Sequence, residues 1–117
     1  MAAYQTTLDG SIHILTVSGR LDPSGGKDLK DTMVALTEGE EKGDLLIDLE
    51  YLDYMASAGF RELFLAGRKI GRKGGRLVVC ALRGEVKRVF ELARFDTAYP
   101  IFETRQQALD HLKAPLA

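Results

Sequence analysis

The chain has 117 residues, of which 45% are hydrophobic and 28% charged, so its composition is that of a globular domain and excludes a disordered or fibrous protein. The formal net charge of −1 gives no basis for nucleic-acid binding, and no apolar run approaches the roughly 18 residues of a membrane helix. With one cysteine, Cys80, and no signal-peptide pattern at the N-terminus, we expect a cytoplasmic protein without membrane association.

The first part of the chain predicts a β-hairpin. Residues 3–8 and 11–18 are rich in β-branched and apolar residues, and Asp9-Gly10 between them is a strong hairpin signal. The second segment is almost continuously apolar, which indicates a central strand covered on both faces. We therefore expect two antiparallel strands that open the sheet.

A helix and a loop are predicted next. Asp22 is suited to cap a helix whose first position is Pro23, and the helix is expected to end near Thr37. Two glycines in its first turn weaken the pattern, so the regular helix is expected to begin nearer Lys27. Residues 38–44 are acidic and glycine-flanked, which predicts a solvated loop.

The central part of the chain predicts a βαβ unit. Residues 45–49 and 77–80 are apolar runs typical of buried strands, and an amphipathic helix that begins at Ser57 separates them. Parallel strands need such a helical crossover. The core-facing stripe of this helix comprises Phe60, Leu63, Phe64, Gly67 and Ile70.

The last third predicts a short helix over 84–93, a strand over 99–102 and a final helix. A proline in that strand favours a place at the sheet edge. Thr104 is suited to cap the final helix together with Gln107. The expected order is ββαβαβαβα: an α/β fold in which residues 1–117 form one domain, with a mixed sheet (an N-terminal antiparallel hairpin, then parallel strands) covered by about four helices.

The sequence contains few residues arranged for catalysis or metal binding. An acidic group at 48–53 lacks the alternating ligands of a calcium site and has no nearby histidine, so a solvated strand end is favoured over a metal site. No phosphate-binding loop, GxGxxG or GxSxG motif is present. His13 and His111 are far apart in sequence, and each is expected to be a surface or partly buried residue and not a base for Ser57. We therefore expect a non-enzymatic protein without a metal or cofactor.

Two further features each have two interpretations. Basic residues over 68–76 either complement the helix dipole, which we favour, or form a docking patch. Ser57 either only caps its helix or acts as a functional residue. The functional interpretation is supported by small neighbours, by a position past the carboxyl end of a central strand, and by a helix N-terminus suited to phosphate.

The ordered motifs of the chain resemble the STAS domain, and within it the anti-sigma factor antagonists of bacterial partner-switching systems. The resemblance covers nearly the whole chain. The residues that carry it are Gly19-Arg20-Leu21-Asp22, Leu46-Ile47-Asp48-Leu49-Glu50-Tyr51-Leu52, Tyr54-Met55-Ala56-Ser57-Ala58-Gly59-Phe60, Gly74-Gly75-Arg76-Leu77-Val78-Val79-Cys80, Val86-Lys87-Arg88-Val89-Phe90 and Gln106-Gln107-Ala108-Leu109.

This resemblance implies a switch. In the family, the unphosphorylated antagonist binds an anti-sigma factor that is also a serine kinase of the GHKL type, and so releases a sigma factor. The kinase phosphorylates a serine that Ser57 matches, and a PP2C-type serine phosphatase resets it; Asp22 matches an acidic residue near the switch. The expected partner-binding residues are Asp22, Ser24, Ala56, Ser57, Ala58, Gly59 and Arg61.

The chain departs from the family at the switch itself. Family members usually carry Asp-Ser-Ser-Gly or Asp-Ser-Thr-Gly, whereas this chain has Ala56-Ser57-Ala58-Gly59. Two alternatives follow: an antagonist switched off by phosphorylation of Ser57, or a STAS scaffold that binds partners without efficient phosphorylation.

Overall fold

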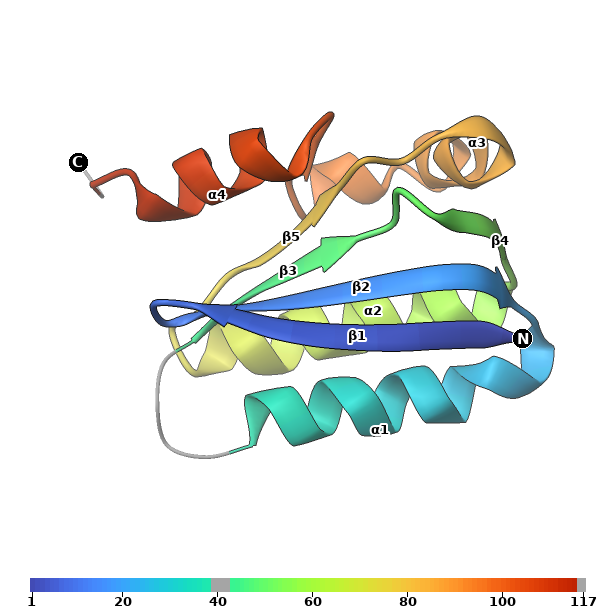
Figure 1. Cartoon of the computed structure of the whole chain (residues 1–117), viewed down its shortest axis with the longest axis horizontal. Helices are drawn as coiled ribbons and strands as arrows, with labels where there is room; N and C mark the ends of the chain where they lie inside the picture. Colours follow the sequence, from blue (N-terminus) through green and yellow to red (C-terminus); the bar gives the residue numbers. More distant parts are fainter. Residues whose placement is uncertain (39–42, 116–117) are drawn as a thin grey trace.

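The computed structural model of the chain describes residues 1–38 and 43–115, so most of the predicted loop over 38–44 lies outside the described residues. A mixed sheet lies between helices (Figure 1). Its strands are β1 (Ala2–Asp9), β2 (Ile12–Leu21), β3 (Asp44–Asp48), β4 (Leu52–Met55), β5 (Leu77–Cys80) and β6 (Ile101–Phe102). The helices are α1 (Gly26–Thr37), α2 (Ser57–Arg72), α3 (Gly84–Leu92) and α4 (Arg105–Lys113), with short 3-10 turns at Pro23–Gly25 and Phe95–Thr97.

The strand order is β1-β2-β3-β5-β6, with β4 paired to the far end of β2. Strands β1 and β2 are antiparallel and every other pairing is parallel, so the predicted α/β fold with a mixed sheet is confirmed. The hairpin turn consists of Gly10 and Ser11, one residue later than the predicted Asp9-Gly10. Gly10 has a φ of 61°, which glycine adopts without the steric cost that a side chain would impose.

Strand β4 was not predicted from the sequence, and it corrects the element order to ββαββαβαβα. It pairs only with the end of β2, where the register shifts between Gly19 and Arg20. This pairing also explains why β2 continues to Leu21, three residues beyond the predicted strand. Four residues are too few to show a strand period, so only the ladder with β2 defines β4.

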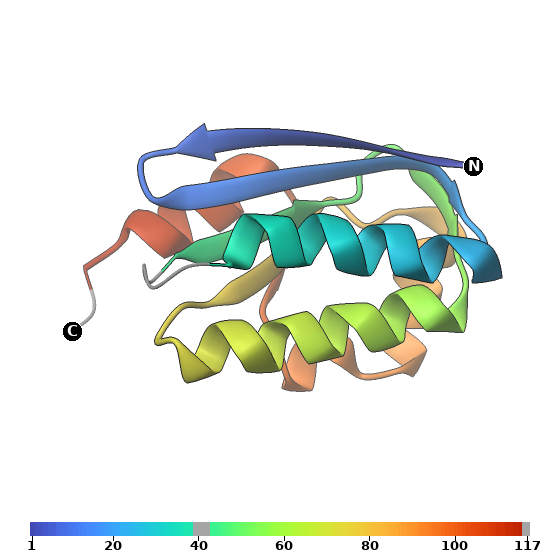
Figure 2. The ribbon, with the colours of Figure 1, turned by 90° about the horizontal axis from the view of Figure 1, so that it is seen from below.

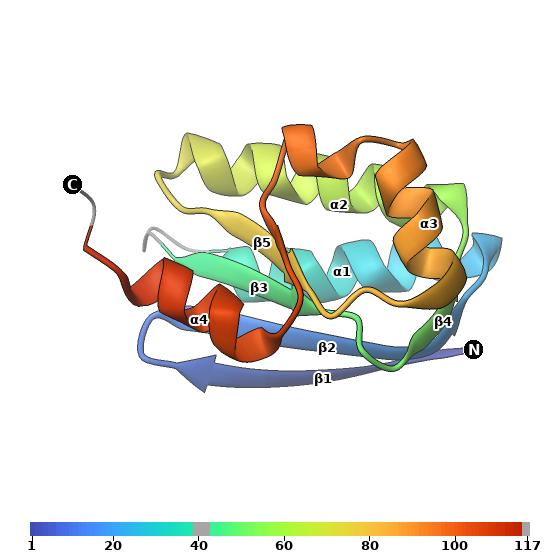
Figure 3. The same ribbon diagram turned by 90° about the horizontal axis from the view of Figure 1, so that it is seen from above.

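Two apolar cores lie on the two faces of the sheet. The larger one joins the sheet to α1 and α2 and extends to α3, where the Phe60 and Phe90 ring centroids are 4.4 Å apart. The smaller one joins the other face to α4 through Ala108, Leu109 and Leu112 (Figure 3). Helices α1 and α2 lie side by side below the sheet (Figure 2). The predicted stripe of α2 therefore faces the larger core, with Phe64 at its margin.

An ion pair between the half-exposed Arg105 and the buried Asp48 carboxylate fixes α4 to the sheet. Asp48 is only 3% exposed, and its Oδ2 accepts a hydrogen bond from Arg105 Nε at 2.8 Å. Arg105 also donates to Thr16 Oγ1 at 2.8 Å. The predicted solvated strand end is thus wrong for Asp48, because α4 covers it. Over the described ranges, no group of acidic, histidine or cysteine side chains is arranged to hold a metal ion.

Burial also determines the chemistry of the single cysteine. Cys80 lies in β5 with none of its surface exposed, and this burial raises the pKa of its thiol to about 12. The thiol therefore stays protonated at neutral pH, and a protonated thiol is unreactive.

Within the part of the chain that is described, no helix is both long and apolar enough to cross a membrane.

Candidate functional site

Ser57 is the first residue of α2 and its side chain is exposed. The N-cap position belongs to Ala56, whose backbone is extended, and no side chain caps the helix. The interpretation of Ser57 as a cap is therefore wrong: it lies one residue inside the helix, so its hydroxyl does not occupy the capping position. The first-turn N–H groups and the positive end of the helix dipole are left without a side-chain acceptor.

The loop after β2 lies beside this helix start. Leu21 O accepts a hydrogen bond from Ala56 N at 2.8 Å, which ties the end of β2 to the residue before α2. A Cβ built on Gly26, the first residue of α1, would lie 3.1 Å from the Ala58 Cβ, so the end of this loop and the first turn of α2 are in close contact. The structure thus brings together two segments that are more than 30 residues apart in the sequence.

Within that loop, Asp22 and Ser24 form a small hydrogen-bonded unit. Asp22 Oδ1 accepts from Ser24 Oγ at 2.7 Å and from Ser24 N at 3.1 Å, and Asp22 is the N-cap of the 3-10 turn that precedes α1. These hydrogen bonds, chiefly that from the Ser24 hydroxyl, hold the pKa of Asp22 below its ordinary value. A fixed negative charge therefore lies in the segment next to the α2 start.

Small residues allow this close arrangement. A Cβ at Gly59 would lie 2.5 Å from Leu21 Cδ2 and 2.8 Å from Met55 Cγ, so any larger residue would have to push the Leu21 and Met55 side chains aside. Gly59 therefore positions the first turn of α2 against the sheet.

The predicted partner-binding residues divide into two groups. Ser24, Ser57 and Arg61 are exposed, and Asp22 and Ala58 are half-buried, so these five contribute to one accessible surface, which we call the Ser57 surface. Ala56 and Gly59 are buried, so they support that surface rather than present side chains to a partner.

One pair at the same edge of the sheet was not identified as part of the site from the sequence. The Arg20 guanidinium lies 4.6 Å from the centroid of the Tyr54 ring, at the carboxyl ends of β2 and β4. Arg20 faces Tyr54 only because β4 pairs with β2. The sequence drew attention to Arg20 as part of the Gly19–Asp22 motif. It did not show that Arg20 contacts Tyr54, because that contact depends on the pairing of β4 with β2.

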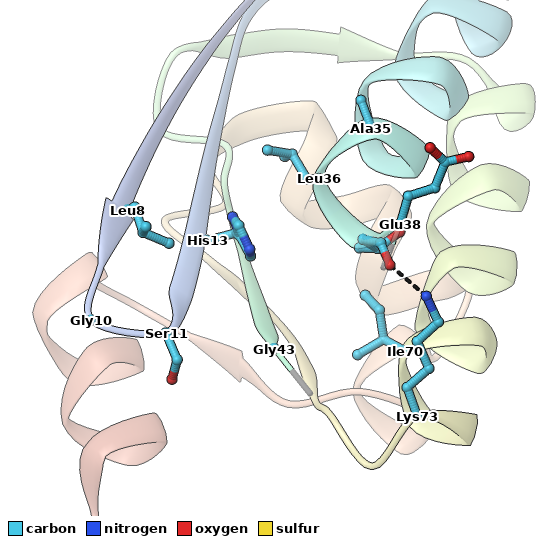
Figure 4. A pocket seen from close by; sticks show the side chains of 11 residues that line it. Leu8, Gly10, Ser11, His13, Ala35, Leu36, Glu38, Gly43, Ile70 and Lys73 are labelled. Atoms are coloured by element: carbon cyan, nitrogen blue, oxygen red, sulfur yellow. Dashed lines mark hydrogen bonds between the residues drawn. The ribbon is translucent and has the colours of Figure 1, made fainter. Parts of the chain in front are cut away.

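The two histidines lie away from the Ser57 surface. His13 lines a hollow of about 360 Å³ at the far end of α2, among Leu8, Leu36, Ile70 and Lys73 (Figure 4). The ring of His111 packs on Phe102, with centroids 4.9 Å apart. His13 is partly buried and His111 is exposed, which confirms their predicted placement as surface or partly buried residues.

The basic residues at the end of α2 serve more than one purpose. Lys69 and Arg72 lie in its last turn, where they complement the dipole as expected. Lys73 Nζ donates to Thr37 O at 2.6 Å, which joins the ends of α2 and α1. Arg76 pairs with Asp44 at 3.0 Å and donates to Leu112 O at 2.9 Å. Arg76 therefore stabilises the fold by joining β3 to α4. If a docking patch exists, it consists of the exposed basic residues of α2.

Comparison with known proteins points to one family. The model of the STAS domain matches residues 3–108. The chain is 29% identical over 109 residues to "Putative anti-sigma factor antagonist BtrV" of Bordetella bronchiseptica, with 93% of this chain and 92% of that protein covered. It is 24% identical over 100 residues to an anti-sigma F factor antagonist of Paenibacillus polymyxa, with 86% of each covered. The crystal structure of an anti-sigma factor antagonist from Mycobacterium paratuberculosis has the same fold, with a TM-score of 0.86, 23% identity, and coverage of 97% of this chain and 96% of that one.

Proposed function

The chain belongs to the STAS domain family, and from that premise we propose that it is an anti-sigma factor antagonist, which binds an anti-sigma factor through the Ser57 surface and so releases a sigma factor. Residues 1–117 act as one domain in the cytoplasm, by binding rather than by catalysis. The observation that carries the proposal is the exposed Ser57 at a helix start that no side chain caps.

Phosphorylation of Ser57 switches this binding off. The anti-sigma factor is a serine kinase of the GHKL type, which transfers the γ-phosphoryl group of ATP to the Ser57 hydroxyl and leaves ADP. A PP2C-type phosphatase removes the group by hydrolysis. The phosphate brings about −1.5 to −2 charges. The open N-terminus of α2 tolerates that charge, so the domain stays folded.

The same charge is unfavourable in an interface. A partner that covers the Ser57 surface would have to desolvate the phosphate, which costs several kcal/mol unless new cations pair with it. The Asp22 carboxylate in the adjacent loop adds charge of the same sign. Phosphorylation is therefore expected to release the partner without unfolding the antagonist.

The proposed switch is tested by comparing two substitutions of Ser57 that have the same shape but differ in charge. Ser57→Asp is expected to weaken binding to the cognate anti-sigma factor about 100-fold, which is about 3 kcal/mol, while the isosteric Ser57→Asn loses much less. Isothermal titration calorimetry measures both. Ser11→Asp, at the opposite end of the sheet, controls for a charge added away from the Ser57 surface. Equal affinity of Ser57→Asp and Ser57→Asn would contradict a charge-operated switch.

A second candidate function is a scaffold that binds its partner without efficient phosphorylation. It is favoured by Ala56 and Ala58, which stand where relatives usually carry an aspartate and a hydroxyl residue. Intact-mass measurement after incubation with ATP and the anti-sigma factor decides between the two. A gain of one phosphate in the wild type but not in Ser57→Ala supports the switch. Binding without any gain supports the scaffold.

A further inference from the structure

The two edges of the sheet differ in length and protection. Strand β6 has two residues and follows Pro100, and both features prevent another strand from pairing with it. Strand β1 has eight residues and forms the opposite edge. No helix lies along its outer side (Figures 2 and 3). The outer backbone groups of β1 are therefore accessible along most of its length.

Strand β1 lacks the features that usually protect an edge. Residues 2–8 contain no charged side chain and no proline, and the register with β2 is unbroken from Ala2 to Asp9. Leu8 is 64% exposed. Long, regular and uncharged edges are the ones that accept a further strand. Asp9, the only charged residue of β1, is already paired with Lys113 at 3.0 Å.

The hairpin geometry indicates which backbone groups are free. In a two-residue hairpin the residues on either side of the turn, here Asp9 and Ile12, form a hydrogen-bonded pair. Bonded and non-bonded pairs then alternate along an antiparallel ladder. The N–H and C=O groups of alternate residues consequently point outward, and these residues are Ala2, Tyr4, Thr6 and Leu8.

We propose that β1 pairs antiparallel with β1 of a second copy of this chain, around a two-fold axis at Gln5. This register uses the whole uncharged segment 2–8 and leaves Asp9 to its ion pair with Lys113. Gln5 then faces the partner's Gln5. The joined sheet has ten strands along its main path, because each copy contributes β1, β2, β3, β5 and β6.

A second copy suits this edge because the edge is complementary to itself. In the Gln5 register Leu8 lies opposite the partner's Ala2, so the exposed apolar side chain at one end meets a small one at the other. Diagonally it lies near the partner's Tyr4, whose ring is held in place by a 3.5 Å contact from Tyr4 Oη to Gly25 O. No like charges face each other, as a C2 interface requires.

The dimer leaves both Ser57 surfaces accessible. The start of β1 lies at the same end of the sheet as the α2 start, since Tyr4 contacts Gly25 in the loop beside that helix. Antiparallel pairing places the two β1 starts at opposite ends of the joined sheet. The inference therefore does not depend on the proposed function, and each can fail without the other.

A single strand pair buries less than the roughly 1,200–2,000 Å² of a stable interface, so we expect a dissociation constant of about 100 µM. Sedimentation equilibrium from about 5 to about 500 µM should show the mean mass rising towards twice the monomer mass. Gln5→Lys should weaken the dimer at least about 10-fold, because two lysines meet at the two-fold axis. Its unfolding curve checks that the monomer fold is kept.

Disulfide trapping tests the register. In an antiparallel, non-hydrogen-bonded pair the Cα atoms lie about 4.5 Å apart, within the range of a disulfide. Gln5→Cys should therefore form a covalent dimer on mild oxidation that reductant reverses. Thr7 lies on the same face and is also exposed, but in this register the two copies of Thr7 are about 14 Å apart, so Thr7→Cys should stay monomeric. Native Cys80 is buried and does not compete.

Either of two results would overturn the proposal. One is a wild-type protein that stays monomeric at about 500 µM. The other is Thr7→Cys or Thr6→Cys cross-linking as readily as Gln5→Cys, which would exclude the Gln5 register.

Discussion

Helices α2 and α4 both begin at the carboxyl edge of the sheet, but their first turns are satisfied in different ways. At α4, Thr104 Oγ1 accepts from Gln107 N at 3.1 Å, and Gln107 Oε1 accepts in return from Thr104 N at 3.3 Å. At α2, Ala56 offers no acceptor. One helix start is closed by its own side chains, while the other is left open to a ligand or a partner.

The first residues of the two helices also differ in how strongly the rest of the fold holds their side chains. Arg105, the first residue of α4, is fixed by Asp48 and Thr16, so its side chain is committed to the fold. Ser57, the first residue of α2, is exposed, with no hydrogen bond from its side chain to any part of the chain that is described. The comparison indicates that side chains at the α4 start contribute to stability, whereas the Ser57 side chain can change with little cost to the fold.

The largest effect is expected where the α4 anchor is broken. Arg105→Ala leaves the buried Asp48 carboxylate without its cation and should lower the free energy of unfolding by about 3 kcal/mol, measured by urea denaturation. Arg83→Ala is the matched control, because the Arg83–Asp53 pair is 3.5 Å long and both side chains are more than half exposed. The control should lose at most about 1 kcal/mol. Equal losses would mean that the Asp48–Arg105 pair does not hold α4.

A smaller change in stability should distinguish the capped start of α4 from the uncapped start of α2. Thr104→Ala removes one half of the capping box and should destabilise the protein by about 1 kcal/mol. Ser57→Ala removes a hydroxyl that caps nothing, so a change within about 0.5 kcal/mol is expected. The same denaturation series measures both variants. A loss at Ser57 as large as that at Thr104 would show that the two starts are not different.

The smallest effect concerns the charge beside the α2 start. The pKa of Asp22 is lowered by hydrogen bonds from Ser24, so the folded state favours the carboxylate. Its contribution to stability is present above the unfolded pKa, near 3.9, and is lost as the pH falls through the lower folded value. An NMR titration should place the Asp22 midpoint below that of an unfolded peptide.

The Ser24 hydroxyl is the main cause of that shift. Ser24→Ala should therefore move the Asp22 midpoint upward, while Ser11→Ala, at the opposite end of the sheet, should leave it unchanged. An unshifted Asp22 in the wild type would mean that the Asp22–Ser24 hydrogen bond is not kept in solution.

Local patterns in the sequence predicted much of the fold. The β-branched runs flanking a glycine turn predicted β1 and β2, and the apolar runs around an amphipathic helix predicted β3, α2 and β5. The spacing of Thr104 and Gln107 predicted the capping box of α4. Each of these signals depends on residues within one or two turns or strands of each other, which is why a single sequence can show them.

The Ser57 surface could be outlined from sequence only in part. The STAS resemblance matched Ser57 and Asp22 to family residues, and the switch hypothesis added Ser24, Ala58 and Arg61 to the expected interface. The roles of all five are still predictions. The predicted start of α2 at Ser57 is confirmed, but the N-cap is Ala56 and not Ser57, although serine is normally preferred to alanine at that position. The tie from Ala56 N to Leu21 O positions this start, and that bond joins residues 35 positions apart.

The sequence by itself determined the fold class, the strands of the hairpin and of the βαβ unit, the core stripe of α2 and the cap of α4, because propensity, periodicity and capping act over a few residues. Only the tertiary structure decided that residues 52–55 form a strand, that Asp48 is buried against Arg105, and that β1 is an open edge. Each of these three features depends on which segment, distant in the sequence, lies next to the residues in the folded chain. Hydrogen-bond ladders and buried ion pairs are formed between partners far apart in the chain, and no local pattern records which partner will be there.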